Sequence, residues 1–197
     1  MVLTDAFAES KRADAKQWIN SAYQVIWDAE EWSFRTATVS ISVAGGSQAA
    51  TGMPADFGNA IYLLHADGDP LRPIQDVRQF YALYGDTSDK ADPVAFTIIG
   101  QASLIVGPTP AADETLTLVH QKNLTVLASD TDTPAFPAGY HMALVFGARM
   151  QGSALLKVPV FDAEQREYER LLQGMRMNFL SPVKGEYEQV GAFRPGY

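Results

Sequence analysis

The spacing of apolar residues changes twice along the chain, from a helical period to a strand period and back. From about Asp5 to Glu31, apolar residues recur every three or four positions, as in an amphipathic helix. One face of this expected helix carries Trp18, Ala22, Val25, Ala29 and Trp32. The stripe is widened by Ile19, Tyr23 and Ile26. So wide a stripe is typical of a helix that several neighbours cover, and it predicts core packing rather than a cofactor site.

A strand period begins after Phe34, where apolar and polar residues alternate up to the turn at Gly45 and Gly46. Turn sequences rich in glycine, proline and aspartate then separate short apolar runs. We expect strands around 38–43, 50–53, 60–65, 94–99, 103–106 and 116–120. Between Pro73 and Tyr84 the pattern predicts one short helix, followed by a polar loop from Gly85 to Asp92.

A helical period returns in the stretch that ends near Met150. Asp132 or Thr133 is the expected N-cap, with Pro134 and Pro137 in the first turn. One face of this helix would carry Tyr140, Ala143, Leu144, Gly147 and Met150. Its small residues, Ala143 and Gly147, predict close contact with other helices, within one subunit and with a neighbouring one.

The last helix is expected from about Asp162 to Leu180, with Asp162 and Gln165 as a capping pair. Its apolar stripe consists of Tyr168, Leu172, Met175 and Phe179. Residues 182–197 have no period, yet they keep four apolar anchors: Tyr187, Val190, Phe193 and Tyr197. Two interpretations stay open, a tail that folds back on its own domain or is disordered, and an arm that grips a partner.

Together these elements predict an α+β fold. It combines a small α-helical bundle, made of the N-terminal helix and two C-terminal helices, with a central antiparallel β-rich insertion and an extended C-terminal arm. The expected boundaries are 1–34 and 132–181 for the bundle, 35–131 for the insertion and 182–197 for the arm.

Composition narrows the function classes. A chain of 197 residues with 47% hydrophobic residues can bury a core. The net charge of −8 argues against binding nucleic acid by phosphate neutralisation, because that needs clustered Lys and Arg. The absence of cysteine excludes disulfides, thiolate zinc sites and thiol nucleophiles. We expect no signal peptide and no membrane span.

The pattern predicts no catalytic, cofactor or metal site. The candidates weighed were His65, His120, His141, Asp67, Asp69, Glu30 and Glu31. The histidines lack metal-ligand spacing, and a turn explains the two aspartates better than a calcium loop does. The two glutamates adjoin Trp32, but a solvated helix end explains them better than a sugar site. No phosphate loop, dinucleotide loop or nucleophile elbow is present.

The order of these elements resembles the head-to-tail adaptor (connector) proteins of tailed bacteriophages, including the tail tubular gatekeeper type of short-tailed phages. The resemblance spans most of the chain. It rests on INSAYQVIWDAEEWSF (Ile19–Phe34), MPADF (Met53–Phe57), LIVGPTP (Leu104–Pro110), DTPAFPAGYHMALVFGA (Asp132–Ala148) and the charged final helix.

The resemblance implies a structural virion protein at the head–tail junction, assembled in the host cytoplasm as a homo-oligomeric ring of twelve copies. Its implied partners are the portal protein and a distal tail component such as a tail terminator, stopper or nozzle. DNA would pass through the lumen without specific binding, and no membrane or cofactor is involved. The protein-interaction residues would be Tyr187, Val190, Phe193, Tyr197, Ala143 and Gly147.

Three alternatives stay open. A tail-tube or baseplate subunit should be dominated by a continuous sheet, whereas this chain begins and ends in predicted helices. A carbohydrate- or receptor-binding module should show exposed aromatic residues on loops, and only Phe57 and Tyr84 fit that description. A hydrolase built from scattered carboxylates requires two of them to converge in a pocket.

Overall fold

A computed structural model describes residues 2–100, 103–156, 159 and 162–180. The described chain forms two compact units, one that includes the residues up to Phe34 and those from Thr125 onward, and one formed by Arg35–Leu124. We call them the helical unit and the β unit. The fold is α+β, as predicted, with four α-helices and two sheets in the described residues.

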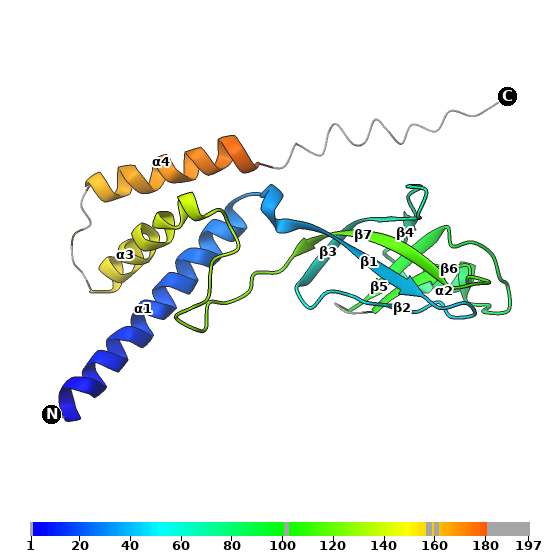
Figure 1. The fold of residues 1–197 in the computed structure, drawn as a ribbon, viewed down its shortest axis with the longest axis horizontal. Coiled ribbons are helices and arrows are strands. Elements are labelled where there is room, and N and C mark those ends of the chain that lie inside the picture. Colours follow the sequence, from blue (N-terminus) through cyan, green and yellow to red (C-terminus); the bar gives the residue numbers. More distant parts are fainter. Residues whose placement is uncertain (1, 101–102, 157–158, 160–161, 181–197) are drawn as a thin grey trace. The chain divides into compact units, whose positions relative to one another are not determined.

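The helical unit consists of three α-helices with short 3₁₀ turns (Figure 1). Its elements are α1 (Val2–Ala29), η1 (Ser33–Arg35, at the junction with the β unit), η2 (Ala138–Tyr140), α3 (Met142–Leu156) and α4 (Asp162–Phe179). The middle helix, α3, packs against both α1 and α4. The buried centre is largely aromatic, since the rings of Tyr23, Trp27, Trp32, Phe34 and Phe136 form a connected set of edge-on and stacked contacts.

The predicted stripe on α1 is partly wrong. Val25 is 55% exposed and Ala29 is exposed, whereas Trp27, which the predicted stripe left out, is buried. The other predicted positions Ala22, Tyr23, Ile26 and Trp32 are buried. A helical period allows the buried face to include, beside Ala22, either Val25 and Ala29 or Tyr23 and Trp27. The second face carries larger aromatic side chains, so its burial removes more apolar area from water. Trp32 lies beyond the last residue of α1, where its indole Nε1 donates a 2.7 Å hydrogen bond to the Ile26 carbonyl.

The predicted start of the next helix is also wrong. Asp132 caps a turn and not the helix, because its Oδ2 accepts the backbone N–H groups of Ala128 and Ser129, both at 2.7 Å. The α-helix begins only at Met142. The two prolines explain the delay, since each disfavours the helical conformation of the residue before it. The buried face of α3 nevertheless contains Ala143, Leu144, Gly147, Ala148 and Gly152.

On α4, the predicted range is close to the observed one, but the capping pair is absent. The Gln165 side chain donates to Glu169 at 3.0 Å. The residues that α4 buries most are Leu171 and Met175. The predicted stripe named Leu172 where the structure buries Leu171, one position earlier, and Leu172 itself is half-buried.

The β unit contains two small sheets. Its elements are β1 (Thr36–Val43), β2 (Ala50–Thr51), β3 (Phe57–Leu64), β4 (Arg72–Pro73), α2 (Val77–Tyr84), β5 (Ala95–Ile99), β6 (Ser103–Gly107) and β7 (Glu114–Lys122). The first sheet has the order β2-β1-β7-β3 and the second β4-β5-β6. All pairs are antiparallel except β4 with β5.

Backbone hydrogen bonds also link the two sheets at both of their edges. On one side the Val106 amide donates to Gln48 at 2.9 Å, beside a bridge between Ala49 and Ile105. On the other side the Leu71 amide donates to Leu63 at 2.8 Å. The sheets therefore enclose one apolar interior, as in a small barrel, and few strand edges stay unpaired. That interior is filled by Ile41, Val43, Phe57, Leu63, Leu71, Phe96, Leu104, Val106, Leu116 and Leu118.

Candidate functional site

The small residues of α3 lie where the three helices of the helical unit meet. Ala143 and Gly147 are both buried there. A Cβ atom added to Gly147 would lie 3.0 Å from the Ala22 Cβ on α1 and 3.4 Å from the Tyr168 ring on α4. Close packing by this glycine is thus used within one subunit. Contact of the same residues with a neighbouring subunit stays a prediction.

A second glycine lets a tryptophan lie flat against α3. A Cβ added to Gly152 would lie only 2.7 Å from the Trp18 ring. Trp18 is half-buried, and its ring lies against Gly152 in the C-terminal half of α3. The local sequence permits this position because glycine is the one residue that leaves room for an indole at such a distance.

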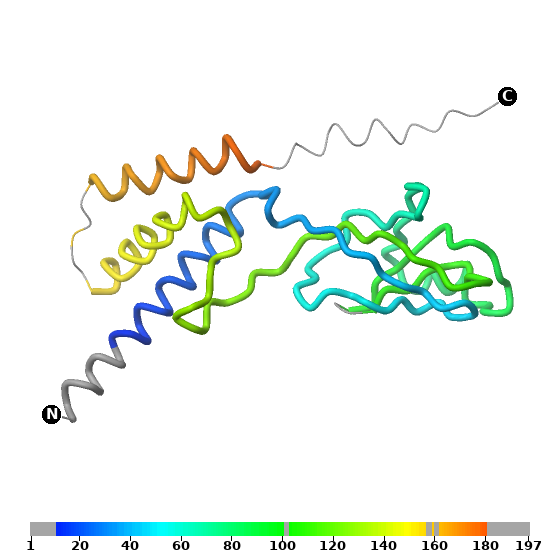
Figure 2. The backbone as a smooth tube through the Cα atoms, viewed as in Figure 1, coloured from blue at the N-terminus to red at the C-terminus, as the bar shows by residue number. Residues whose placement is uncertain are grey.

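A loop of the helical unit crosses α1, and one side chain of α1 binds both backbone groups of a loop residue. The Asn20 Nδ2 donates to the Leu127 carbonyl at 3.0 Å, and the Asn20 Oδ1 accepts from the Leu127 amide at 2.9 Å. The backbone trace in Figure 2 shows this segment passing over α1. Because Asn20 matches both backbone groups of Leu127, it acts as a clamp on the loop.

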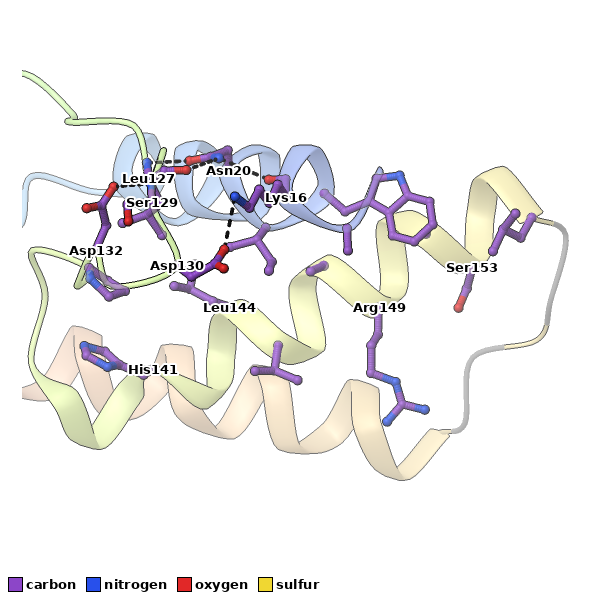
Figure 3. A pocket seen from close by; sticks show the side chains of 18 residues that line it. Lys16, Asn20, Leu127, Ser129, Asp130, Asp132, His141, Leu144, Arg149 and Ser153 are labelled. Atoms are coloured by element: carbon purple, nitrogen blue, oxygen red, sulfur yellow. Dashed lines mark hydrogen bonds and ion pairs between the residues drawn. The ribbon is translucent and has the colours of Figure 1, made fainter. Parts of the chain in front are cut away.

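Between α1, α3 and this loop lies a cavity of about 740 Å³ (Figure 3). We call it the groove. Its volume is within the range of natural binding pockets, and most of its wall is apolar. The side chains that give it this character include Trp18, Ile19, Leu144, Val145, Ala148 and Leu156.

Most charges around the groove are in ion pairs, and the Asp132 carboxylate accepts two backbone amides instead. Asp130 accepts from Lys16 at 3.0 Å and is also paired with Arg12. On the other side, Arg149 is paired with Glu164 of α4. With these charges compensated, the groove favours an apolar occupant over a small ion.

The polar groups inside the helical unit are engaged in structure. His141 Nε2 lies 2.9 Å from the Phe136 carbonyl, so this side chain makes a polar contact at the start of the helical segment. The Tyr23 hydroxyl accepts the Ala135 amide at 2.7 Å. Burial raises the pKa of Tyr23, and the Ala135 hydrogen bond partly offsets this. Both side chains are thus hydrogen-bonded to the backbone of their own unit.

In the β unit, the candidate residues also have local explanations. The Asp67 Oδ1 accepts the Asp69 amide at 3.2 Å, as in an Asx turn. His120 is buried against the ring of Phe57.

In the helical unit, the Glu30 carboxylate is bound by the Arg176 guanidinium at 2.8 Å. Among the described residues, no group of three or more His, Asp or Glu side chains is arranged to hold a metal ion.

One pair in the β unit is electrostatically distinct. His65 Nε2 lies 2.6 Å from the Pro93 carbonyl, and its Nδ1 lies 3.8 Å from Glu114 Oε2. Desolvation raises the pKa of the Glu114 carboxyl, and the charge of Asp92 acts in the same direction, while His65 lowers it. The pair lies where β7 begins, next to the turn after β3.

The other predicted interaction residues, Tyr187, Val190, Phe193 and Tyr197, lie outside the described residues. Sequence reasoning missed the groove and the clamp at Asn20. A signal for the groove was present, because α3 continues with Leu155 and Leu156 after its small-residue face, and those side chains are 71% and 54% exposed. A helix that is apolar on more than one face indicates a second contact surface.

A family model described as SU10 adaptor protein matches residues 2–184, and so spans both units. No curated protein matches the sequence closely enough to be a recognisable relative. Among the described helices, none has the length and apolar character required to cross a bilayer.

Proposed function

The chain belongs to the SU10 adaptor protein family and is a structural adaptor of a bacteriophage, and we propose that it forms the ring that joins the portal to the tail. In this proposal twelve copies surround the DNA conduit at the head–tail junction. One side of the ring binds the portal protein, and the other binds a tail terminator, stopper or nozzle. The observation that carries the proposal is the family match over residues 2–184.

The proposed role is structural and not enzymatic. The contacts described above support this, since Asp67 is used in a turn, His141 in a helix contact and Glu30 in an ion pair. The net charge of −8 supports a conduit through which DNA passes without specific binding, because acidic walls avoid salt-dependent adhesion.

We assign the portal contact to the C-terminal arm, residues 182–197, and the distal contact to the β unit. Aromatic anchors such as Tyr187 and Phe193 are the side chains that most often dominate protein interfaces. Ala143 and Gly147 are buried in one subunit, so in the ring they would keep the helical unit rigid while its outer faces contact the neighbouring copies.

The test is to mix the purified full chain with its portal and to measure mass by light scattering and shape by negative-stain microscopy. We expect a monomer or weak oligomer alone and a closed ring on the portal. The double variant Tyr187→Ser, Phe193→Ser should lower portal affinity at least tenfold, whereas Tyr81→Ser, an exposed tyrosine of α2, should not. A stable two-fold dimer that the portal leaves unchanged would contradict the ring.

A further inference from the structure

The groove exposes apolar surface that one more segment of chain would cover. Val145 is 44% exposed and Leu156 54%, and both line the cavity. Trp18 and Ile19 are half-buried on the opposite wall. Covering side chains of this size removes apolar surface from water, which favours binding in proportion to the area covered. An occupant with several apolar side chains would therefore bind with appreciable affinity.

The chain that follows α4 starts close to one end of this groove. Leu180 forms a β-bridge with Trp32, and the Phe179 ring lies 5.7 Å from that of Tyr140. His141, the next residue, lines the groove. Seventeen residues follow Leu180 in the sequence, and such a length spans about 56 Å when extended. It is long enough to turn round the end of the unit and run the length of the groove.

We propose that in the free subunit the groove holds the C-terminal arm of the same chain. The dimensions agree. From Leu144 to Leu156 the α3 wall is about 18 Å long at 1.5 Å per residue. The anchors Tyr187 and Phe193 are about 20 Å apart along an extended chain. Tyr187, Val190 and Phe193 can thus reach the groove together.

The charges agree as well. Within the arm, Lys184 and Arg194 balance Glu186 and Glu188, so its side chains carry no net charge. Around the groove, Lys16 and Arg12 are paired with Asp130 and Arg149 with Glu164, and the Asp132 carboxylate accepts two backbone amides. A neutral segment with apolar anchors therefore enters without leaving a charge unpaired, whereas a strongly charged partner segment would lose hydration at the apolar wall.

The arm of the same chain is favoured over that of a second copy by its local concentration. Because the arm is joined covalently to the same unit by a short segment, its effective concentration at the groove is in the millimolar range, far above the concentration of free subunits in solution. The docked arm would shield the groove and its own anchors until assembly. Binding to the portal would then require the arm to leave the groove, which links this inference to the portal contact proposed above.

Engineered cysteines test the docking directly, because the native chain contains no cysteine. In the full chain, Ser153→Cys places a thiol on the groove wall, and Ala192→Cys places one next to Phe193. The matched control combines Ala192→Cys with Ala163→Cys, on an exposed position of α4 outside the groove. At micromolar protein in a glutathione redox buffer, we expect the Ser153 pair to form an intramolecular disulfide at least tenfold faster than the control.

A second measurement uses the anchors themselves. Trp27 and Trp32 are buried, so Trp18 is the tryptophan in the groove that responds to its occupant. In the native background, Tyr187→Ser with Phe193→Ser should shift tryptophan emission to longer wavelength, and the shift should vanish in a Trp18→Phe chain. The same two substitutions should slow the Ser153–Ala192 crosslink to the rate of the control.

Equal crosslinking rates for the two pairs, or an unchanged emission, would overturn the proposal. Disulfides that form between chains and not within them would also overturn it, in favour of a second copy as the occupant. All these measurements use the isolated subunit, so they succeed or fail whether or not the protein forms a ring on the portal.

Discussion

In the β unit, apolar side chains from both sheets meet in one interior, and seven of them have no exposed surface: Ile41, Val43, Leu63, Leu104, Val106, Leu116 and Leu118. The helical unit uses aromatic rings around Tyr23 and Phe136 instead, and it has a groove of about 740 Å³ on one side. Both units are similar in size, so the difference is not one of available residues. It follows from how each element satisfies its backbone.

A strand must find hydrogen-bond partners in other strands, and this requirement draws the two sheets together until their edges pair. A helix satisfies its backbone internally. Three helices can therefore form a stable unit while leaving an apolar face open, and α1 and α4 both pack on α3 without closing around it. An apolar face that a helical unit leaves open in this way is available to a further segment of chain.

The substitution with the largest expected effect tests whether the β unit and the helical unit unfold independently. Leu118 has no exposed surface and lies in the middle of β7. We expect Leu118→Ala to lower the stability of the β unit by about 3 kcal/mol, because the cavity left behind adds to the lost burial. Amide hydrogen exchange of β7 measures this loss. Val119→Ala, at a half-buried position on the other face of the strand, should have a smaller effect.

Tryptophan fluorescence provides the comparison between the units. Trp18, Trp27 and Trp32 all belong to the helical unit. In Leu118→Ala, the urea midpoint measured by tryptophan emission should remain at its native value. An equal shift of the fluorescence midpoint would mean that the two units unfold together, and the comparison would then fail.

An intermediate effect is expected at the groove. In Gly152→Leu the new side chain would collide with the Trp18 ring, since a Cβ alone lies 2.7 Å from it. Overpacking of this kind costs about 1–3 kcal/mol, partly offset by the better helix propensity of leucine. The urea midpoint of tryptophan emission should fall. Ala154→Leu, at an exposed position of the same helix, serves as the control and should leave that midpoint unchanged.

The smallest effect concerns pH and the β unit. The folded state raises the pKa of Glu114, so the folded protein binds this proton more tightly than the unfolded chain does. The stability that the neutral carboxyl provides is present at low pH and is lost as pH rises above the usual glutamate range. Glu114→Gln keeps the neutral form, so its Tm should exceed that of the native chain at pH 7.

The difference between the two Tm values should disappear as pH falls below about 4, where both side chains are neutral. Asp86→Asn is the control, because the pKa of Asp86 is lowered by Ser88 and the sign of its contribution is opposite. A Glu114→Gln chain that is less stable than the native chain at pH 7 would show that the pairing of Glu114 with His65 outweighs desolvation.

Much of the fold was predictable because strand and helix periods are local. The alternation from Val39 to Val43 correctly placed Ile41 in the interior, and the turn at Gly45 and Gly46 followed from glycine's freedom, with Gly46 at φ 80°. The small-residue face at Ala143 and Gly147 was also visible. The helix cap at Asp132 was predicted wrongly, because a carboxylate that fits a helix N-terminus fits a nearby turn equally well.

The groove was not predictable in the same way. Its walls come from α1, α3 and the loop near Leu127, and the pairing of Asn20 with that loop joins residues more than a hundred positions apart. No period in the sequence relates such positions. Only the packing of α1 on α3 brings Trp18 over Gly152 and leaves the neighbouring apolar side chains uncovered.

The sequence by itself determined which segments are helices and most of the strands, because hydrophobic period and turn chemistry act over a few residues. It also determined the family, since the SU10 adaptor family model matches residues 2–184. The tertiary structure decided which face of α1 is buried, how the sheets close on each other and where apolar surface stays open. A helix or strand often has more than one face that it could bury. Which face is buried depends on how much apolar surface it covers against distant segments, and this is decided only when all the elements pack together.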